Sequence, residues 1–128
     1  MAARWTASLA ATCERLAAAA GVVTLVIGAA LTGAPLRTSS ALALGASPVG
    51  ARVLGLADLA LAPGLLRGRP RWPWMAGRAL LNVVVAQRFS AASRCAGGHT
   101  RSRRGAAAMS TLAVVDGGAA MVLWRSRR

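Results

Sequence analysis

Three ionisable residues lie in largely apolar stretches of this chain: Asp58, Arg78 and Asp116. Inside a bilayer such a side chain costs free energy, so it needs an opposite charge, a polar cavity or a shallow depth. When paired with one another, buried charges can fix which helices meet. An available carboxylate can instead relay a proton or bind an ion or polar substrate. These residues are therefore the candidate site.

The other reactive residues form no catalytic or metal-binding pattern. The one histidine, His99, lies in a Gly- and Arg-rich stretch, and no Ser-His-Asp or Cys-His arrangement has a supporting motif. Cys13 and Cys95 stand far apart without CxxC spacing, so we expect two free thiols rather than a zinc site or disulfide. No phosphate-binding glycine loop appears. We expect no catalytic residue, no cofactor, no metal and no enzyme activity.

The composition predicts a membrane protein. Of the 128 residues, 55% are hydrophobic and only 15% are charged, whereas soluble domains carry about 25% charged residues. The net charge of +13 comes from 16 basic residues, all of them arginine. Most of these lie between or beyond the apolar runs, where they attract anionic lipid head groups. Without a recognition helix or stacking platform, we expect no nucleic-acid partner.

Four runs predict an all-α bundle of four transmembrane helices, joined up-down-up-down in one membrane domain covering residues 1–128. The helices are expected at about residues 16–35, 41–66, 72–87 and 105–124, with a basic loop at 88–104. About 20 apolar residues rising 1.5 Å each cross a hydrocarbon core of about 30 Å. In the second run a proline invites a kink, and Pro63 is placed to end the helix. A short or re-entrant element over 49–66 is the alternative there.

The start of the chain and its orientation leave alternatives open. A basic start before an apolar core also fits a cleaved signal peptide. The long lead-in, and a small-x-small site that lies only at 41–43, favour a retained helix. The numbers of arginines on the two sides of the membrane are nearly equal, so the positive-inside rule does not fix the orientation. We prefer the orientation in which both ends of this cell-membrane protein lie in the cytoplasm. The basic loop at 88–104 is the main objection to it. Eight arginines share the side of the termini and six the other: Arg4, Arg15, Arg67, Arg69, Arg71, Arg125, Arg127 and Arg128 against Arg37, Arg88, Arg94, Arg101, Arg103 and Arg104.

Counting residues from the helix ends places the charges by depth. Asp58 and Asp116 fall about 12 Å, and Arg78 about 9 Å, below one and the same boundary. We expect Arg78 to bridge both aspartates, with Asn82 one turn deeper as a hydrogen-bond partner. Arg52 falls near the opposite boundary, where it can snorkel. A guanidinium keeps a neighbouring carboxylate ionised, so these charges are expected to hold the helices together rather than to relay a proton.

The segment Ala51–Asn82 resembles small four-helix integral membrane proteins of actinobacterial type. These typically show an Arg-x-x-Gly-x-x-Asp/Glu-Leu stretch, a basic turn and a third helix containing tryptophan. The resemblance covers 32 of the 128 residues and implies a multi-pass membrane protein, with no activity to carry over. Ala57 departs from it, because a second arginine often stands there. The matching residues are Arg52, Gly55, Asp58, Leu59, Trp74, Arg78 and Asn82.

Two classes of function follow. The preferred one is a non-enzymatic accessory or interaction protein that acts through helix packing in the lipid bilayer. The alternative is a small oligomeric transporter or channel that uses the layer of Asp58 and Asp116. Four short helices leave little room for a pathway within one protomer, so the alternative requires a homo-oligomer. The preferred class requires a membrane partner that the sequence does not identify.

Overall fold

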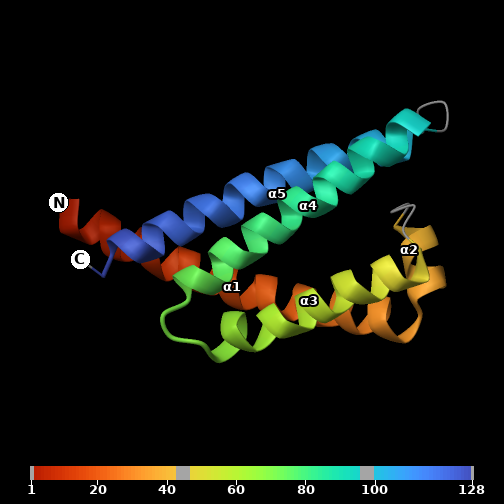
Figure 1. The fold of residues 1–128 in the computed structure, drawn as a ribbon. Helices are drawn as coiled ribbons and strands as arrows, with labels where there is room; N and C mark the ends of the chain where they lie inside the picture. The colour runs from red at the N-terminus through yellow and green to blue at the C-terminus, as the bar shows by residue number, and fades with distance from the viewer. Residues whose placement is uncertain (1, 43–46, 96–99, 128) are drawn as a thin grey trace.

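The structure is a computed structural model that describes residues 2–42, 47–95 and 100–127. Within these ranges every element of regular structure is a helix (Figure 1). The helices are α1 (Ala2–Gly33), α2 (Pro35–Ala41), α3 (Pro48–Arg67), α4 (Trp72–Cys95) and α5 (Thr100–Arg125). The all-α prediction is therefore confirmed.

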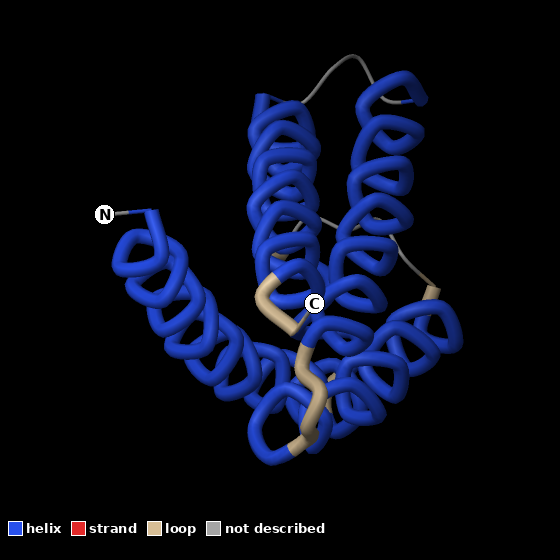
Figure 2. Tube along the Cα trace, turned by 90° about the vertical axis from the view of Figure 1, so that its left-hand side faces the viewer, coloured by secondary structure: helices blue, strands red, loops and turns tan. Residues whose placement is uncertain are grey.

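The four long helices form two antiparallel pairs. Figure 1 shows α1 beside α3 and α4 beside α5, with successive long helices running in opposite directions. The two pairs meet at the end that holds both termini and the α3–α4 turn, and they diverge toward α2. The view in Figure 2, turned by 90°, shows the same division into two pairs. The two pairs therefore lie closest to each other at the end that holds the termini.

Among the described residues, three helical segments are long and apolar enough to cross a membrane: Ala7–Gly33, Pro48–Arg67 and Thr100–Arg125. The expected fourth, on α4, is not among them. Its sequence carries Arg78, Asn82 and Arg88 among its apolar residues, and these lower its mean hydropathy. Composition and length therefore indicate a membrane protein with three such helices.

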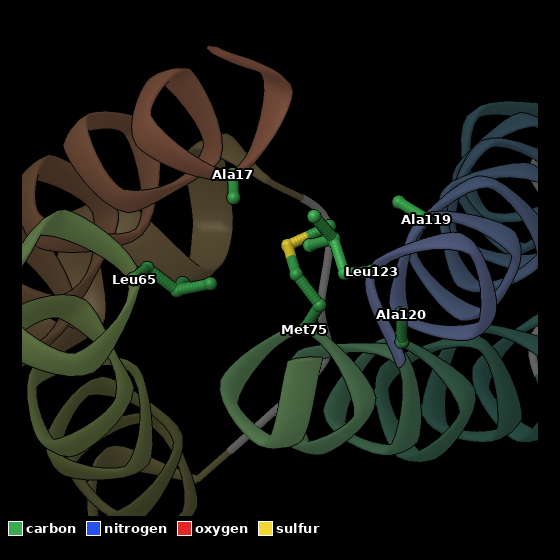
Figure 3. Close-up of a cluster of buried hydrophobic side chains, with 6 residues drawn as sticks. All are labelled: Ala17, Leu65, Met75, Ala119, Ala120 and Leu123. Atoms are coloured by element: carbon green, nitrogen blue, oxygen red, sulfur yellow. The ribbon is translucent and has the colours of Figure 1, made fainter. Parts of the chain in front are cut away.

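The hydrophobic core begins where the two pairs meet. Side chains from all four long helices converge on Met75, which is fully buried (Figure 3). Further toward the diverging end, Phe89 of α4 packs in a second cluster with Leu31, Ala51 and Leu54 of the other pair. The first cluster comprises Ala17, Leu65, Met75, Ala119, Ala120 and Leu123. The two clusters thus tie the pairs together at separate levels.

The α1–α3 pair rests on a close approach between two glycines. A Cβ added to Gly28 would lie 2.9 Å from the carbonyl oxygen of Gly55, and a Cβ on Gly55 would lie 2.9 Å from that of Gly28. Thr32, one turn beyond, donates its hydroxyl to the Gly28 carbonyl at 2.8 Å. Small residues let helix backbones approach and gain van der Waals contact within a bilayer. In the α1–α3 pair, Gly28 and Gly55 are the two positions at which a small residue permits this close approach.

Several predicted boundaries are wrong. The first helix begins at Ala2 instead of residue 16, because the alanine-rich lead-in is itself a strong helix former. The second long helix begins at Pro48, where the Ser47 hydroxyl accepts a hydrogen bond from the Gly50 amide at 3.1 Å. Pro48 therefore starts the helix. Pro63 does not end the helix: α3 continues through it to Arg67, one residue past the predicted end at residue 66. Part of the predicted 41–66 helix, residues 43–46, lies outside the described residues.

The predicted basic loop at 88–104 is also wrong over most of its length. Residues 88–95 continue α4, and residues 100–104 already belong to α5; the remainder, 96–99, lies outside the described residues. Within α4 the Ser90 hydroxyl donates to the Ala86 carbonyl at 2.9 Å. Phe89 packs so close to Gly105 that a Cβ there would lie 2.8 Å from the ring. Tertiary pairing of α4 with α5 thus extends both helices.

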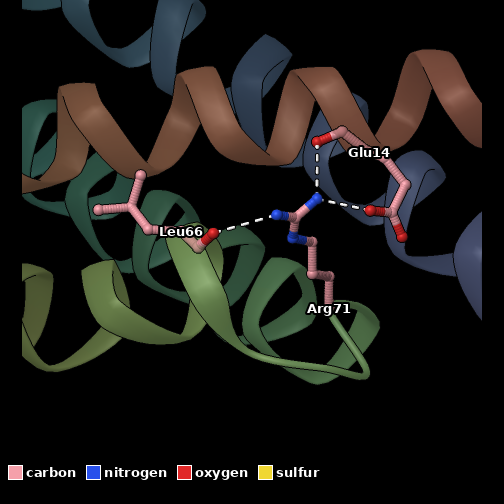
Figure 4. A network of polar contacts seen from close by, with 3 residues as sticks. All are labelled: Glu14, Leu66 and Arg71. Atoms are coloured by element: carbon pink, nitrogen blue, oxygen red, sulfur yellow. Dashed lines mark hydrogen bonds and ion pairs between the residues drawn. The ribbon is translucent and has the colours of Figure 1, made fainter.

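Arg71 connects the α3–α4 turn to α1 through an ion pair with Glu14. Its Nη1 lies 2.5 Å from the Glu14 carboxylate, and its Nη2 donates to the Leu66 carbonyl at 3.0 Å (Figure 4). The Glu14 side chain is 39% exposed, so solvent screens this ion pair. The contact nevertheless joins residues 57 positions apart in the sequence.

Arg71→Gln is expected to lower the free energy of unfolding by about 1 kcal/mol, because it removes one partly screened ion pair and one hydrogen bond to a helix end. The measurement is a titration with sodium dodecyl sulfate in mixed micelles, followed by circular dichroism. Arg69→Gln is the matched control, since Arg69 is exposed in the same turn. Equal losses in the two variants would show that only the net charge of the turn matters.

Candidate functional site

The centre of the candidate site is a buried ion pair between α4 and α5. Nη1 of Arg78 lies 2.6 Å from Oδ2 of Asp116, and the two side chains are only 10% and 2% exposed. Both residues were expected from the sequence to lie at one depth. The structure brings them together although 38 positions separate them. A charge-assisted hydrogen bond of this length is among the stronger polar contacts in proteins.

Two neutral side chains complete this arrangement. Asn82 lies four residues after Arg78 on the same face of α4, and its Nδ2 donates to the same Asp116 oxygen at 2.7 Å. Nε of Arg78 donates to the Thr24 hydroxyl of α1 at 2.8 Å. We call Thr24, Arg78, Asn82 and Asp116 the polar network. It links α1 with the α4–α5 pair.

Asp58 stands apart from the polar network. In the part of the chain that the structure describes, its carboxylate takes part in no hydrogen bond and no ion pair, although Arg78 is near enough to act on it electrostatically. The expected bridge from Arg78 to both aspartates is therefore only half present. The reason is geometric: Asp58 lies on α3, and Arg78 directs its Nε to Thr24 of α1 and its Nη1 to α5.

The structure does not bring the remaining candidate residues of the sequence into the polar network. Arg52 is exposed near the start of α3 and belongs to neither ion pair of the described residues. Cys13 is a half-buried free cysteine on α1. Cys95 ends α4, and His99 lies outside the described residues. Across residues 2–42, 47–95 and 100–127 no group of three or more metal-ligating side chains lies together.

A cavity of about 140 Å³ lies between the two helix pairs, beside the polar network. Its polar lining consists of Thr24, Asp58, Arg78 and Asn82, and all four long helices contribute to its wall. The rest of the lining is apolar and includes Leu31, Leu54, Leu81, Val85, Phe89 and Met109. The site thus combines the Asp58 carboxylate, which forms no hydrogen bond within the described residues, and an apolar wall that can contact a hydrocarbon group.

Chemically, the two aspartates are set for different tasks. Asp116 accepts two hydrogen bonds from α4, so it is committed to holding α4 against α5. Asp58 accepts no hydrogen bond from the described residues, and it lines the cavity. A buried pair fixes geometry, whereas an available intramembrane carboxylate is the kind of group that binds a cation.

Sequence reasoning did not single out Thr24 or the Arg71–Glu14 contact. Thr24 interrupts the charge-free apolar run of the first helix, and this polar residue was the available signal. In the sequence, Arg71 is one of several arginines between the second and third apolar runs. Which of them would meet the only glutamate depends on how α1 runs past the turn.

Comparison with protein-family models, with curated proteins and with solved structures found no match to this chain. The resemblance of Ala51–Asn82 to small four-helix membrane proteins therefore stays a prediction.

Proposed function

We propose that this chain is a multi-pass protein of the cell membrane, without enzymatic activity, that acts as an accessory or interaction subunit through helix packing. The observation that carries the proposal is the polar network. Arg78 and Asp116 pair with each other inside the protein, and Asn82 and Thr24 supply further hydrogen bonds. Charges committed in this way suit a scaffold of fixed shape better than a proton relay.

The proposal includes α4 as a fourth transmembrane helix. Its 24 residues would span about 36 Å, enough to cross a hydrocarbon core. Arg78 and Asn82 are buried against other helices, whereas Leu80, Val83 and Val84 are exposed. Polar residues that face the inside and apolar residues that face outward are what a membrane helix with low mean hydropathy requires. The exposed arginines near the ends of α4 and α5 are placed to contact anionic lipid head groups.

Four crossings predict a definite sidedness. Single cysteines placed at Arg69 and Ser126 should react with a membrane-impermeant maleimide from one side of sealed vesicles, in a background without Cys13 and Cys95. Cysteines at Arg37 and Arg101 should react from the other side. Both termini and the α3–α4 turn lie at one end of the molecule, which supports this arrangement. Labelling of Arg69→Cys and Arg101→Cys from the same side would show that α4 does not cross.

The accessory role is tested by extracting the affinity-tagged chain from its native membrane in polymer nanodiscs. We expect a complex with another membrane protein in a fixed ratio, and no proton flux when the purified chain is reconstituted into vesicles loaded with a pH-sensitive dye. The cavity beside Asp58 favours the second candidate, an oligomeric transporter or channel. A homo-oligomer that carries protons or ions would contradict the accessory role and support that candidate.

A further inference from the structure

The cavity between the helix pairs has the size and lining of a small-molecule site. Its volume is about 140 Å³, and a dry apolar cavity of about 150 Å³ engineered in another protein binds benzene. Leu54 and Phe89, which are 9% and 5% exposed, belong to this lining. The space therefore suits one aromatic ring or a similarly compact hydrocarbon group.

The charges beside this cavity do not cancel. Arg78 forms its ion pair with Asp116, so those two groups neutralise each other. Asp58 lines the same cavity and forms no hydrogen bond or ion pair within residues 2–42, 47–95 and 100–127. With both carboxyl groups ionised, the three residues carry one net negative charge. A carboxylate in apolar surroundings gains from a partner of opposite charge.

We propose that the cavity binds a small organic monocation, an ammonium group attached to a compact apolar body, with Asp58 as its counter-ion. The ammonium group would lie against the Asp58 carboxylate, and the apolar body would lie between Leu54 and Phe89. A hard inorganic divalent cation fits less well, because it requires several oxygen ligands and most of this lining is hydrocarbon. The inference requires neither the accessory role nor the transport role considered above.

The net charge of the whole chain makes the prediction specific. At +13 the protein repels cations in general. Preferential binding of an organic cation must therefore come from a local group, and Asp58 is the aspartate in the described residues that no ion pair already uses. An anionic ligand would instead have to bind the Arg78 guanidinium, whose Nη1 already pairs with Asp116, and would lie beside the Asp58 carboxylate.

The test uses the full chain in nanodiscs of zwitterionic lipid, with empty nanodiscs subtracted. Three ligands of matched size are titrated by ¹⁹F NMR: 4-fluorobenzylammonium, the neutral 4-fluorobenzyl alcohol and the anionic 4-fluorobenzoate. We expect the ammonium compound to bind about tenfold tighter than the alcohol, as one charge-assisted contact implies. Equal binding of ammonium and alcohol would overturn the proposal. So would tighter binding of the benzoate, because that result would assign the site to Arg78.

Variants then assign the charge preference to one residue. Asp58→Asn should bind the ammonium compound no better than the alcohol, whereas Asp58→Glu should keep the preference. Arg52→Gln is the matched control, since Arg52 is an exposed charge on the same helix, and it should bind like the wild type. An unchanged preference in a folded Asp58→Asn protein would overturn the proposal. If that variant does not fold, the comparison of the three ligands on the wild-type chain still decides.

Discussion

Asp116→Leu is expected to lower the free energy of unfolding by about 3–5 kcal/mol, the usual cost of removing one partner from a buried ion pair. The Asp116 side chain is 2% exposed and accepts hydrogen bonds from Arg78 at 2.6 Å and from Asn82 at 2.7 Å. Without it, the Thr24 hydroxyl would be the only hydrogen-bond partner left to the Arg78 guanidinium among the described residues. The measurement is a titration with sodium dodecyl sulfate in mixed micelles, followed by circular dichroism.

Two further variants separate the loss of the pair from the loss of a carboxylate. The double variant Arg78→Met, Asp116→Leu should recover much of the stability, because it removes both members of the buried ion pair together and leaves no guanidinium without its carboxylate. Asp58→Asn is the matched single change, and it should cost far less, since Asp58 forms no ion pair in the described residues. If the double variant were less stable than Asp116→Leu, the network would contribute through more than its charge balance.

Gly28→Ala is expected to lower the free energy of unfolding by about 1–3 kcal/mol, the usual cost of overpacking a close contact. The new Cβ would lie 2.9 Å from the Gly55 carbonyl oxygen and 3.0 Å from the Asp58 Cβ. A helix backbone cannot move aside as the end of a flexible side chain can, so α1 and α3 would have to separate. The same titration measures the effect.

Gly118→Ala is the matched control, and its expected sign is opposite. Gly118 lies within α5, and a Cβ added there meets nothing within 4 Å. Alanine is the better helix former by about 1 kcal/mol, so this variant should be slightly more stable than the wild type. Destabilisation by both substitutions, in similar amounts, would show that the Gly28–Gly55 contact contributes nothing particular.

Composition and residue spacing alone predict the class of fold and part of the site. Long apolar runs predicted helices, and depth counting placed Arg78 and Asp116 at one level. The same counting gave Asp58 that level too, but depth along a helix says nothing about which side of the helix faces which neighbour. The structure pairs Arg78 with Asp116 and leaves Asp58 at the cavity. Helix ends were predicted least well, because packing between α4 and α5 extends both helices.

By itself, the sequence determined that this is an all-helical chain whose apolar runs suit a membrane, because helix formation and lipid solubility depend on local composition. Only the tertiary structure decided how these helices divide into two diverging pairs. That arrangement commits Asp116 to Arg78 and sets Asp58 beside a cavity of about 140 Å³. The physical reason is that a contact between helices depends on their crossing and rotation. Here these follow from glycine contacts and hydrogen bonds between residues far apart in the sequence.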